Sequence, residues 1–303
     1  METFFASIPI LVLIVLMGVF KVAGDKSSII TLLITAFLAI LAFHSPVPDT
    51  VNSFLYGMLK ALVPILFIIL MAIYSYNVLL QTKKIEVLKQ QFSSISTDKS
   101  VQVLLITWGF GGLLEGLAGF GTAVAIPAAI LISLGFRPVF SALVSLIANS
   151  VPTAFGAVGV PVIVLAQETG LPVIPLSTAV VLQLSVLMLL VPLVITFLAD
   201  PRMKALPKNL LLSLLVGGVS LATQYLAARY IGAETPAIVG AIASIIVIVV
   251  IGKLTGKGGE KPIPMTYSGG EVFRAWAVYV LIMVLILFTS PLFPAVREML
   301  SGV

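Results

Sequence analysis

The chain has 303 residues, of which 60% are hydrophobic and 10% are charged, and its mean hydropathy of +1.20 indicates a polytopic membrane protein rather than a soluble domain. It has no cysteine and a single histidine, His44, which excludes disulfides, cysteine nucleophiles and thiolate or histidine metal sites. In a membrane chain the net charge of +5 reports which loops face the cytoplasm, so we expect no nucleic-acid partner.

The apolar runs of the chain predict an all-α protein with about eight spanning helices, because most runs match the thickness of one bilayer crossing. The first run follows Met1 and Glu2 without a basic segment, so we expect it to remain as a helix rather than to be cleaved as a signal. The runs cover residues 4–20, 27–43, 57–80, 101–134, 138–166, 176–198, 209–228, 235–251 and 275–290.

The distribution of basic residues predicts a multi-pass protein whose N-terminus lies outside the cell. With the N-terminus outside, 14 of the 17 Lys and Arg residues are cytoplasmic, all except Lys60, Arg229 and Arg297. The connections 82–100 and 252–274 are then cytoplasmic loops, and the whole chain, 1–303, forms a single transmembrane region. This count requires that the run 101–134 enters and leaves on the same side, because a single crossing would invert every later loop.

Two of the apolar runs are too long to be ordinary spans. A helix over 101–134 would be about 51 Å long, against about 30 Å of hydrocarbon, so we predict a re-entrant hairpin or two short spans there. The run 138–166 carries Pro and Gly residues between Asn149 and Pro161, which predicts a broken helix.

Glu115 is the only charged residue between Lys99 and Arg137, and six glycines surround it in the segment 109–121. Ionisable residues inside membrane segments are costly to insert and usually mark a path for protons, ions or substrate. We therefore predict that Glu115 couples proton binding to substrate binding. The alternative is a structural acid that accepts hydrogen bonds from backbone amides of the broken helix.

The two breaks also predict a binding site. If the chain reverses near 116–121, a half-helix begins near Thr122 with its free N–H groups directed inward, where a carboxylate fits. At the second break Ser150 is expected to cap a helix that starts at Pro152. The alternative for these polar residues is interhelical hydrogen bonding, and for the glycines it is packing alone. The candidate substrate contacts are Gly119, Gly121, Thr122, Asn149, Ser150, Thr153 and Gln183.

The segments 113–126, 134–136 and 148–161 together resemble the bacterial L-lactate permease family, and similar stretches at 7–10, 230–236 and 274–276 extend the resemblance over most of the chain. The resemblance implies a carrier of the bacterial plasma membrane that moves L-lactate, glycolate or another small 2-hydroxy monocarboxylate with protons. The driving force is then the proton gradient rather than a cofactor. The resemblance also implies an inverted-repeat transporter, of which this chain is one half.

Members of that family typically continue into a second membrane half, whereas this chain stops at Val303. The missing half is then a separate protein or a second copy of the chain, or the chain is a truncated product. Leu117 and Ala123 also depart from the family pattern and leave the identity of the substrate open.

Three other functions also fit these residues: a carrier coupled to sodium, a carrier of another organic anion, or an inactive half that scaffolds a partner permease. An enzyme is disfavoured, because the chain carries neither a zinc-protease helix motif nor a nucleophile elbow.

Overall fold

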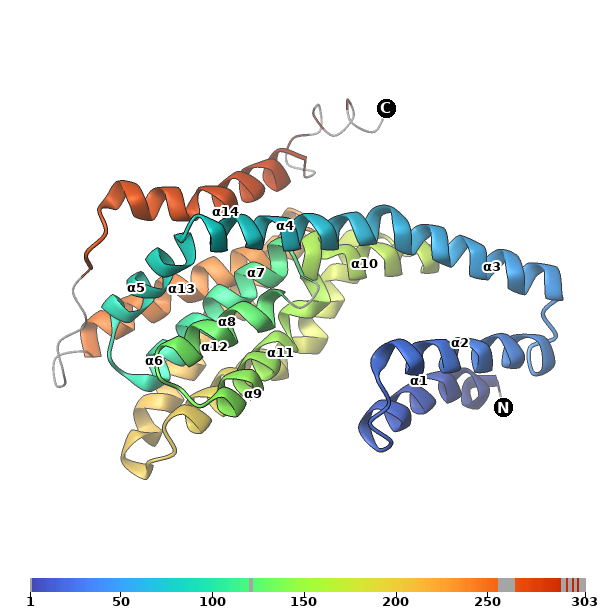
Figure 1. Cartoon of the computed structure of the whole chain (residues 1–303), viewed down its shortest axis with the longest axis horizontal. Helices are drawn as coiled ribbons and strands as arrows, with labels where there is room; N and C mark the ends of the chain where they lie inside the picture. The colour runs from blue at the N-terminus through green and yellow to red at the C-terminus, as the bar shows by residue number, and fades with distance from the viewer. Residues whose placement is uncertain are drawn as a thin grey trace. The chain divides into compact units, whose positions relative to one another are not determined.

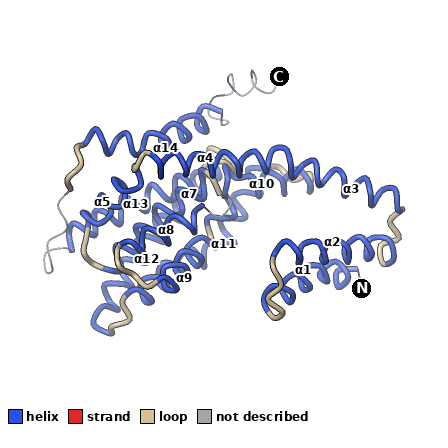
Figure 2. Tube along the Cα trace, viewed as in Figure 1, coloured by secondary structure: helices blue, strands red, loops and turns tan. Residues whose placement is uncertain are grey.

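The computed structural model of the chain describes residues 2–119, 122–255 and 265–289, together with residues 293, 296 and 299. Every regular element in these residues is a helix, and Figure 2 shows no strand among them. The all-α prediction is therefore confirmed. The chain divides into two compact units, residues 1–67 and 68–303, and each is described by itself.

The first unit consists of α1 (Glu2–Gly18), α2 (Gly24–Leu41), α3 (Val47–Lys60) and the irregular turn η1 (Ala61–Leu66). α1 packs against α2, and α2 packs against α3. The large apolar side chains of these helices face outward, as Ile14, Leu33 and Phe37 show, and the only buried residue of α2 is Ser27. A surface of this kind is stable in lipid and not in water.

The second unit holds the remaining helices (Figure 1). Its first half contains α4 (Phe67–Gln81), α5 (Lys84–Ile95), α6 (Lys99–Leu104), η2 (Leu105–Phe110), α7 (Gly111–Leu117), α8 (Thr122–Ser133) and α9 (Pro138–Asn149). Its second half contains η3 (Pro152–Phe155), α10 (Gly156–Thr169), α11 (Val173–Ala199), η4 (Met203–Ala205), α12 (Leu206–Tyr230), α13 (Pro236–Thr255) and α14 (Gly269–Thr289). The consecutive helices α11, α12 and α13 pack side by side.

The segment α6–η2–α7 is the central helix of this unit. It runs from Lys99 to Leu117, and 94% of it is buried inside the protein, where it contacts α8, α9, α11 and α13. Close packing on α13 is possible because Gly116 has no side chain. A Cβ atom there would lie 2.8 Å from Cγ1 of Ile238 and 3.1 Å from its backbone nitrogen. The glycine at position 116 thus lets the central helix lie close against α13.

The chain folds back after the central helix, as its length predicts. α7 ends at Leu117, and α8 begins at Thr122 and returns along α7 and η2. α8 has 12 residues and therefore spans only about 18 Å, too little for a full crossing. The broken helix is also confirmed, because α9 and the segment Pro152–Thr169 meet at an angle of 52°.

The described residues contain candidate spans for part of the expected eight crossings. Five helices in the described residues are long and apolar enough, or six if the bent pair forms one span. The apolar helices Phe4–Gly18 and Ala123–Ser133 are shorter than a full crossing. The connection 82–100, expected as a loop, contains the helix α5, which packs against α14 and α13.

The connection between α11 and α12 carries a cluster of ionic and polar contacts. Asp98 accepts hydrogen bonds from the first amides of α6 and pairs with Lys208 of α12. Arg202 donates two hydrogen bonds of 2.7 Å to the Asp200 carboxylate and lowers the pKa of Asp200 to about 2. The buried amide of Asn209 donates to the carbonyl oxygen of Asp200. These contacts fix the end of the α11–α12 hairpin.

We expect the Asp200–Arg202 pair to make stability depend on pH in the acidic range. Because the pKa of Asp200 is lowered in the folded state, its stabilising contribution is full above its ordinary pKa of about 4 and is lost as the pH falls toward about 2. Thermal unfolding in detergent should therefore show that Arg202→Gln lowers Tm modestly at neutral pH and has no effect near the acidic limit. Lys204→Gln, at an exposed neighbouring position, is the control. A Tm difference that stays constant with pH would contradict the assignment.

Gly217 and Gly218 of α12 offer a matched test of helix packing. A Cβ atom at Gly217 would lie 2.5 Å from the carbonyl oxygen of Met188 and 3.1 Å from Cα of Leu189, whereas a Cβ at Gly218 meets nothing within 4 Å. We expect Gly217→Ala to destabilise the protein by about 1–3 kcal/mol through overpacking, and Gly218→Ala to be neutral or to stabilise it by up to about 1 kcal/mol. Thermal unfolding of the two variants measures this difference in stability. Equal shifts in Tm would contradict the close packing at Gly217.

Candidate functional site

Glu115 lies in the last turn of α7, and only 4% of its surface is exposed. Gly156, the first residue of α10, lies directly against its carboxyl group. A Cβ atom at Gly156 would overlap Oε1 and would lie 3.1 Å from the carboxyl carbon. The packing of α7 against α10 therefore leaves the carboxyl group just the space that a glycine provides.

Asn149 is the polar neighbour of the Glu115 carboxyl group. It ends α9, and its Nδ2 donates a hydrogen bond of 3.0 Å to Oγ1 of Thr153. In the described part of the chain, neither Oε2 of Glu115 nor Oδ1 of Asn149 has a hydrogen-bond partner, although both atoms are buried. Two buried acceptors without donors are costly. Three partners would satisfy these acceptors: a proton bound to the carboxyl group, a hydroxyl group of a ligand, or a cation.

The turn after α7 brings Gly119 to this region. Gly119 has a φ of +60°, and a Cβ there would lie 3.1 Å from the backbone nitrogen of Ala157. Gly121 lies outside the described residues. Thr122 begins α8 as expected, but its side chain is outside the described part of the structure. The structure thus joins Gly119 to the break in the second helix, and the role of Gly121 and Thr122 remains a prediction.

Three other predicted contacts differ from expectation or lie apart. Ser150 does not cap η3, because its hydroxyl group donates instead to the carbonyl oxygen of Ile147 at 2.7 Å. Thr153 is exposed and bonds within its own turn, donating to the Asn149 carbonyl oxygen at 2.5 Å. Gln183 is exposed on α11, and no hydrogen bond in the described residues joins it to Glu115.

The most unusual backbone of the site is the start of α10. Ala157, Val158 and Gly159 follow one another in the left-handed region, with φ values of 44°, 63° and 75°. Such a conformation is strained for alanine and even more for β-branched valine, and strained residues tend to cluster at functional sites. We call Ala157–Gly159 the left-handed turn. Sequence reasoning placed a break here and did not predict this conformation.

The candidate residues predicted from the sequence also did not include Glu234. Glu234 lies between α12 and α13, beside a cavity of about 460 Å³. Its Oε2 is buried and has no hydrogen-bond partner in the described residues. The signal in the sequence was an acid flanked by Gly232 and Pro236 at the border of an apolar run.

No metal cluster accompanies these acids. In the described ranges, no group of three or more His, Asp and Glu side chains comes together. What the site around Glu115 offers is a buried acid, an amide acceptor and the glycines that pack against them. Such an arrangement has the chemistry to accept a proton or a small polar ligand.

A family model for L-lactate permeases matches residues 2–303. The chain is 39% identical to an L-lactate permease of Streptococcus iniae over 303 residues, which are 100% of this chain and 64% of that protein. It is 34% identical to the glycolate permease GlcA of Escherichia coli over 93% of this chain and 54% of that protein. It is 32% identical to an L-lactate permease of Bacillus subtilis over 98% of this chain and 55% of that protein.

The chain therefore spans between 54% and 64% of the length of these three relatives. No solved structure matches it. The family match is a match of sequence. The geometry of the site is that of this chain alone, because there is no matching solved structure to compare with it.

We expect Gly156→Ala to destabilise the protein by about 1–3 kcal/mol, because the added methyl group overlaps the Glu115 carboxyl group. The φ of −65° at Gly156 suits alanine, so the effect reports the contact rather than the backbone. A double-mutant cycle with Glu115→Ala should show a coupling of about 0.5–3 kcal/mol in thermal unfolding. Gly112→Ala is the control, since its Cβ would make an ordinary contact of 3.5 Å with Ala241. Additive effects of the two changes would contradict the contact.

Proposed function

Because the chain belongs to the L-lactate permease family, we propose that it is the transport-active part of a proton-coupled carrier for L-lactate or a related small 2-hydroxy monocarboxylate. The relatives are named for lactate and for glycolate, and both substrates have a carboxylate and a hydroxyl group on adjacent carbons. No covalent bond is made or broken in this function. The carrier resides in the bacterial plasma membrane, with its N-terminus outside.

The observation that carries the proposal is the buried Glu115 carboxyl group beside Asn149. A charged carboxylate that is buried without a cation is unfavourable, so the bound proton makes the group stable in this interior. A substrate carboxylate adds a second negative charge at the same place, and like charges in a medium of low dielectric constant repel strongly. The anion therefore binds better when Glu115 is protonated.

This repulsion is the coupling mechanism. Proton binding and anion binding favour each other by the same free energy, because linkage between two sites is reciprocal. The proton and the anion together carry no net charge, so the loaded site has the same net charge as the empty site with Glu115 ionised. The substrate hydroxyl group is a donor that suits the unpaired Oδ1 of Asn149.

A sodium-coupled carrier is the second candidate, and the same two atoms favour it. Oε2 of Glu115 and Oδ1 of Asn149 are both oxygen acceptors, which a sodium ion accepts as ligands. Uptake of labelled L-lactate driven by a proton gradient alone or by a sodium gradient alone separates the two candidates. The experiment uses vesicles with this chain and vesicles that also contain a candidate second half. If the chain binds no 2-hydroxy acid in either case, a scaffolding role replaces both.

We expect Glu115→Gln to abolish the benefit of a proton gradient while the protein still folds and inserts. Glutamine keeps the size and hydrogen bonding of the side chain and removes its proton. Proton-driven uptake should fall by about 5- to 150-fold, the usual size of a coupling between two sites, while exchange of labelled for unlabelled substrate continues. Glu168→Gln, at an exposed acid near the end of α10, is the matched control and should transport normally. Normal pH-driven uptake by Glu115→Gln would refute the role of Glu115.

A further inference from the structure

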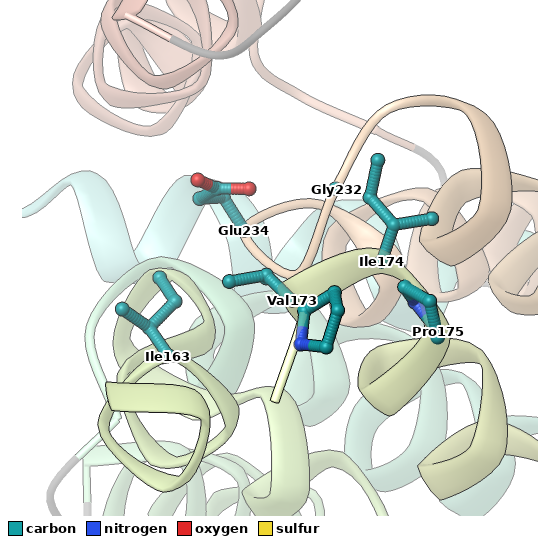
Figure 3. A pocket seen from close by; sticks show the side chains of 7 residues that line it. Ile163, Val173, Ile174, Pro175, Gly232 and Glu234 are labelled. Atoms are coloured by element: carbon teal, nitrogen blue, oxygen red, sulfur yellow. The ribbon is translucent and has the colours of Figure 1, made fainter. Parts of the chain in front are cut away.

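The cavity beside Glu234 shares the helix α10 with the site of Glu115. It measures about 460 Å³, and its lining comes from α10, the start of α11 and the connection between α12 and α13. Figure 3 shows the side chain of Glu234 together with those of Ile163, Val173, Ile174 and Pro175, which line the cavity with it. Glu234 is the only ionisable residue among those that line the cavity.

Glu234 is unusual for an acid at the end of a helix hairpin, because its Oε2 is shielded from solvent and has no hydrogen-bond partner in the described residues. Thr235, the next residue, also has a buried hydroxyl oxygen without a partner there. The cavity walls are apolar, so they satisfy neither group. A carboxylate in this position is stabilised by a proton or by water that enters the cavity.

A direct line of contacts joins Glu234 to Glu115 through the left-handed turn. At one end, Gly156 lies against the Glu115 carboxyl group. At the other end, a Cβ atom at Gly159 would overlap the carbonyl oxygen of Ala233 and would lie 3.0 Å from the backbone nitrogen of Glu234. The Glu115 carboxyl group and the backbone of Ala233 and Glu234 therefore lie at opposite ends of one four-residue segment, 156–159. A shift of this segment changes the surroundings of both.

The other charged and titratable groups near Glu234 leave it without a cation partner. On α10 the acid Glu168 is exposed, and the first turn of α11 carries no charge. At the end of α12, Arg229 lies over the ring of Tyr230 at 5.9 Å and lines a neighbouring cavity of about 530 Å³. Tyr225 lies one turn earlier on α12, and Glu115 lies on α7. No ion pair within the described ranges joins Arg229 to Glu234.

We propose that Glu234 is a second proton-binding carboxyl group of the carrier, reached through this cavity and coupled to Glu115 by the left-handed turn. The ligand is the proton itself, delivered by water in the cavity. The inference rests on the proposed function, since a second proton site has a use only where protons drive transport. Strain in the turn fits this role, because a segment held away from its preferred conformation by packing on both sides responds to a change on either side.

The test follows protonation directly and does not need transport. Infrared difference spectra of the full chain in vesicles, recorded while the pH is lowered, resolve the carbonyl band of each buried carboxylic acid. We expect Glu234→Gln to remove one component of this band and Glu115→Gln to remove another. Glu168→Gln should leave both.

Two further variants keep the test decisive. Glu234→Asp retains an acid in case glutamine impairs folding. In this variant the component of the carbonyl band that belongs to position 234 should remain, at a changed frequency. Gly159→Ala disturbs the turn and leaves both acids, so it should alter both components together. An unchanged band in Glu234→Gln, or a Gly159→Ala variant that alters neither component, overturns the proposal. Wild-type uptake that ignores a proton gradient would instead refute the proposed function, and the spectra distinguish the two failures.

Discussion

The structure depends on burying one acid, Glu115, inside a protein that itself lies in lipid. The carboxyl group is stable there only if the surrounding backbone comes close and if a donor reaches its oxygens. The glycines meet the first condition. Gly116 lets the central helix approach α13, and Gly156 leaves room for the carboxyl group at the start of α10. Asn149 meets the second condition only in part, because Oε2 of Glu115 stays without a partner in the described residues; in our proposal the proton and the substrate complete it. Packing and transport chemistry thus impose the same requirement on the same residues.

The two breaks in the helices are consequences of this requirement. A continuous helix over either run would satisfy its own backbone and leave no polar group directed at an interior site. In the structure, the end of α7 and the start of α10 meet at Gly119 and Ala157, and the left-handed turn continues from there toward Glu234. Irregular backbone is tolerated at membrane depth where protein covers it. The nearly complete burial of the central helix provides that cover.

Much of this arrangement is predictable from local sequence. Composition identifies the membrane as the solvent, since its effect sums over every residue. The length of the runs 101–134 and 138–166 predicts that each must fold back or break, because the bilayer has a fixed thickness. Glu115 is conspicuous as a lone charge among apolar residues. Ser150 shows the limit of such reasoning, because a hydroxyl group that can cap one helix can equally donate to the preceding turn, as it does.

The amino-acid sequence by itself determined the all-helical class, the two breaks and the acid at the first of them, because these follow from hydrophobicity, chain length and the cost of a charge in lipid. Only the tertiary structure decided which residues meet. It placed Gly156 on Glu115, turned Ala157–Gly159 into the left-handed region and brought Glu234 to the far end of the same turn. Contacts of this kind join residues more than forty positions apart, and their free energy depends on packing that no local pattern encodes.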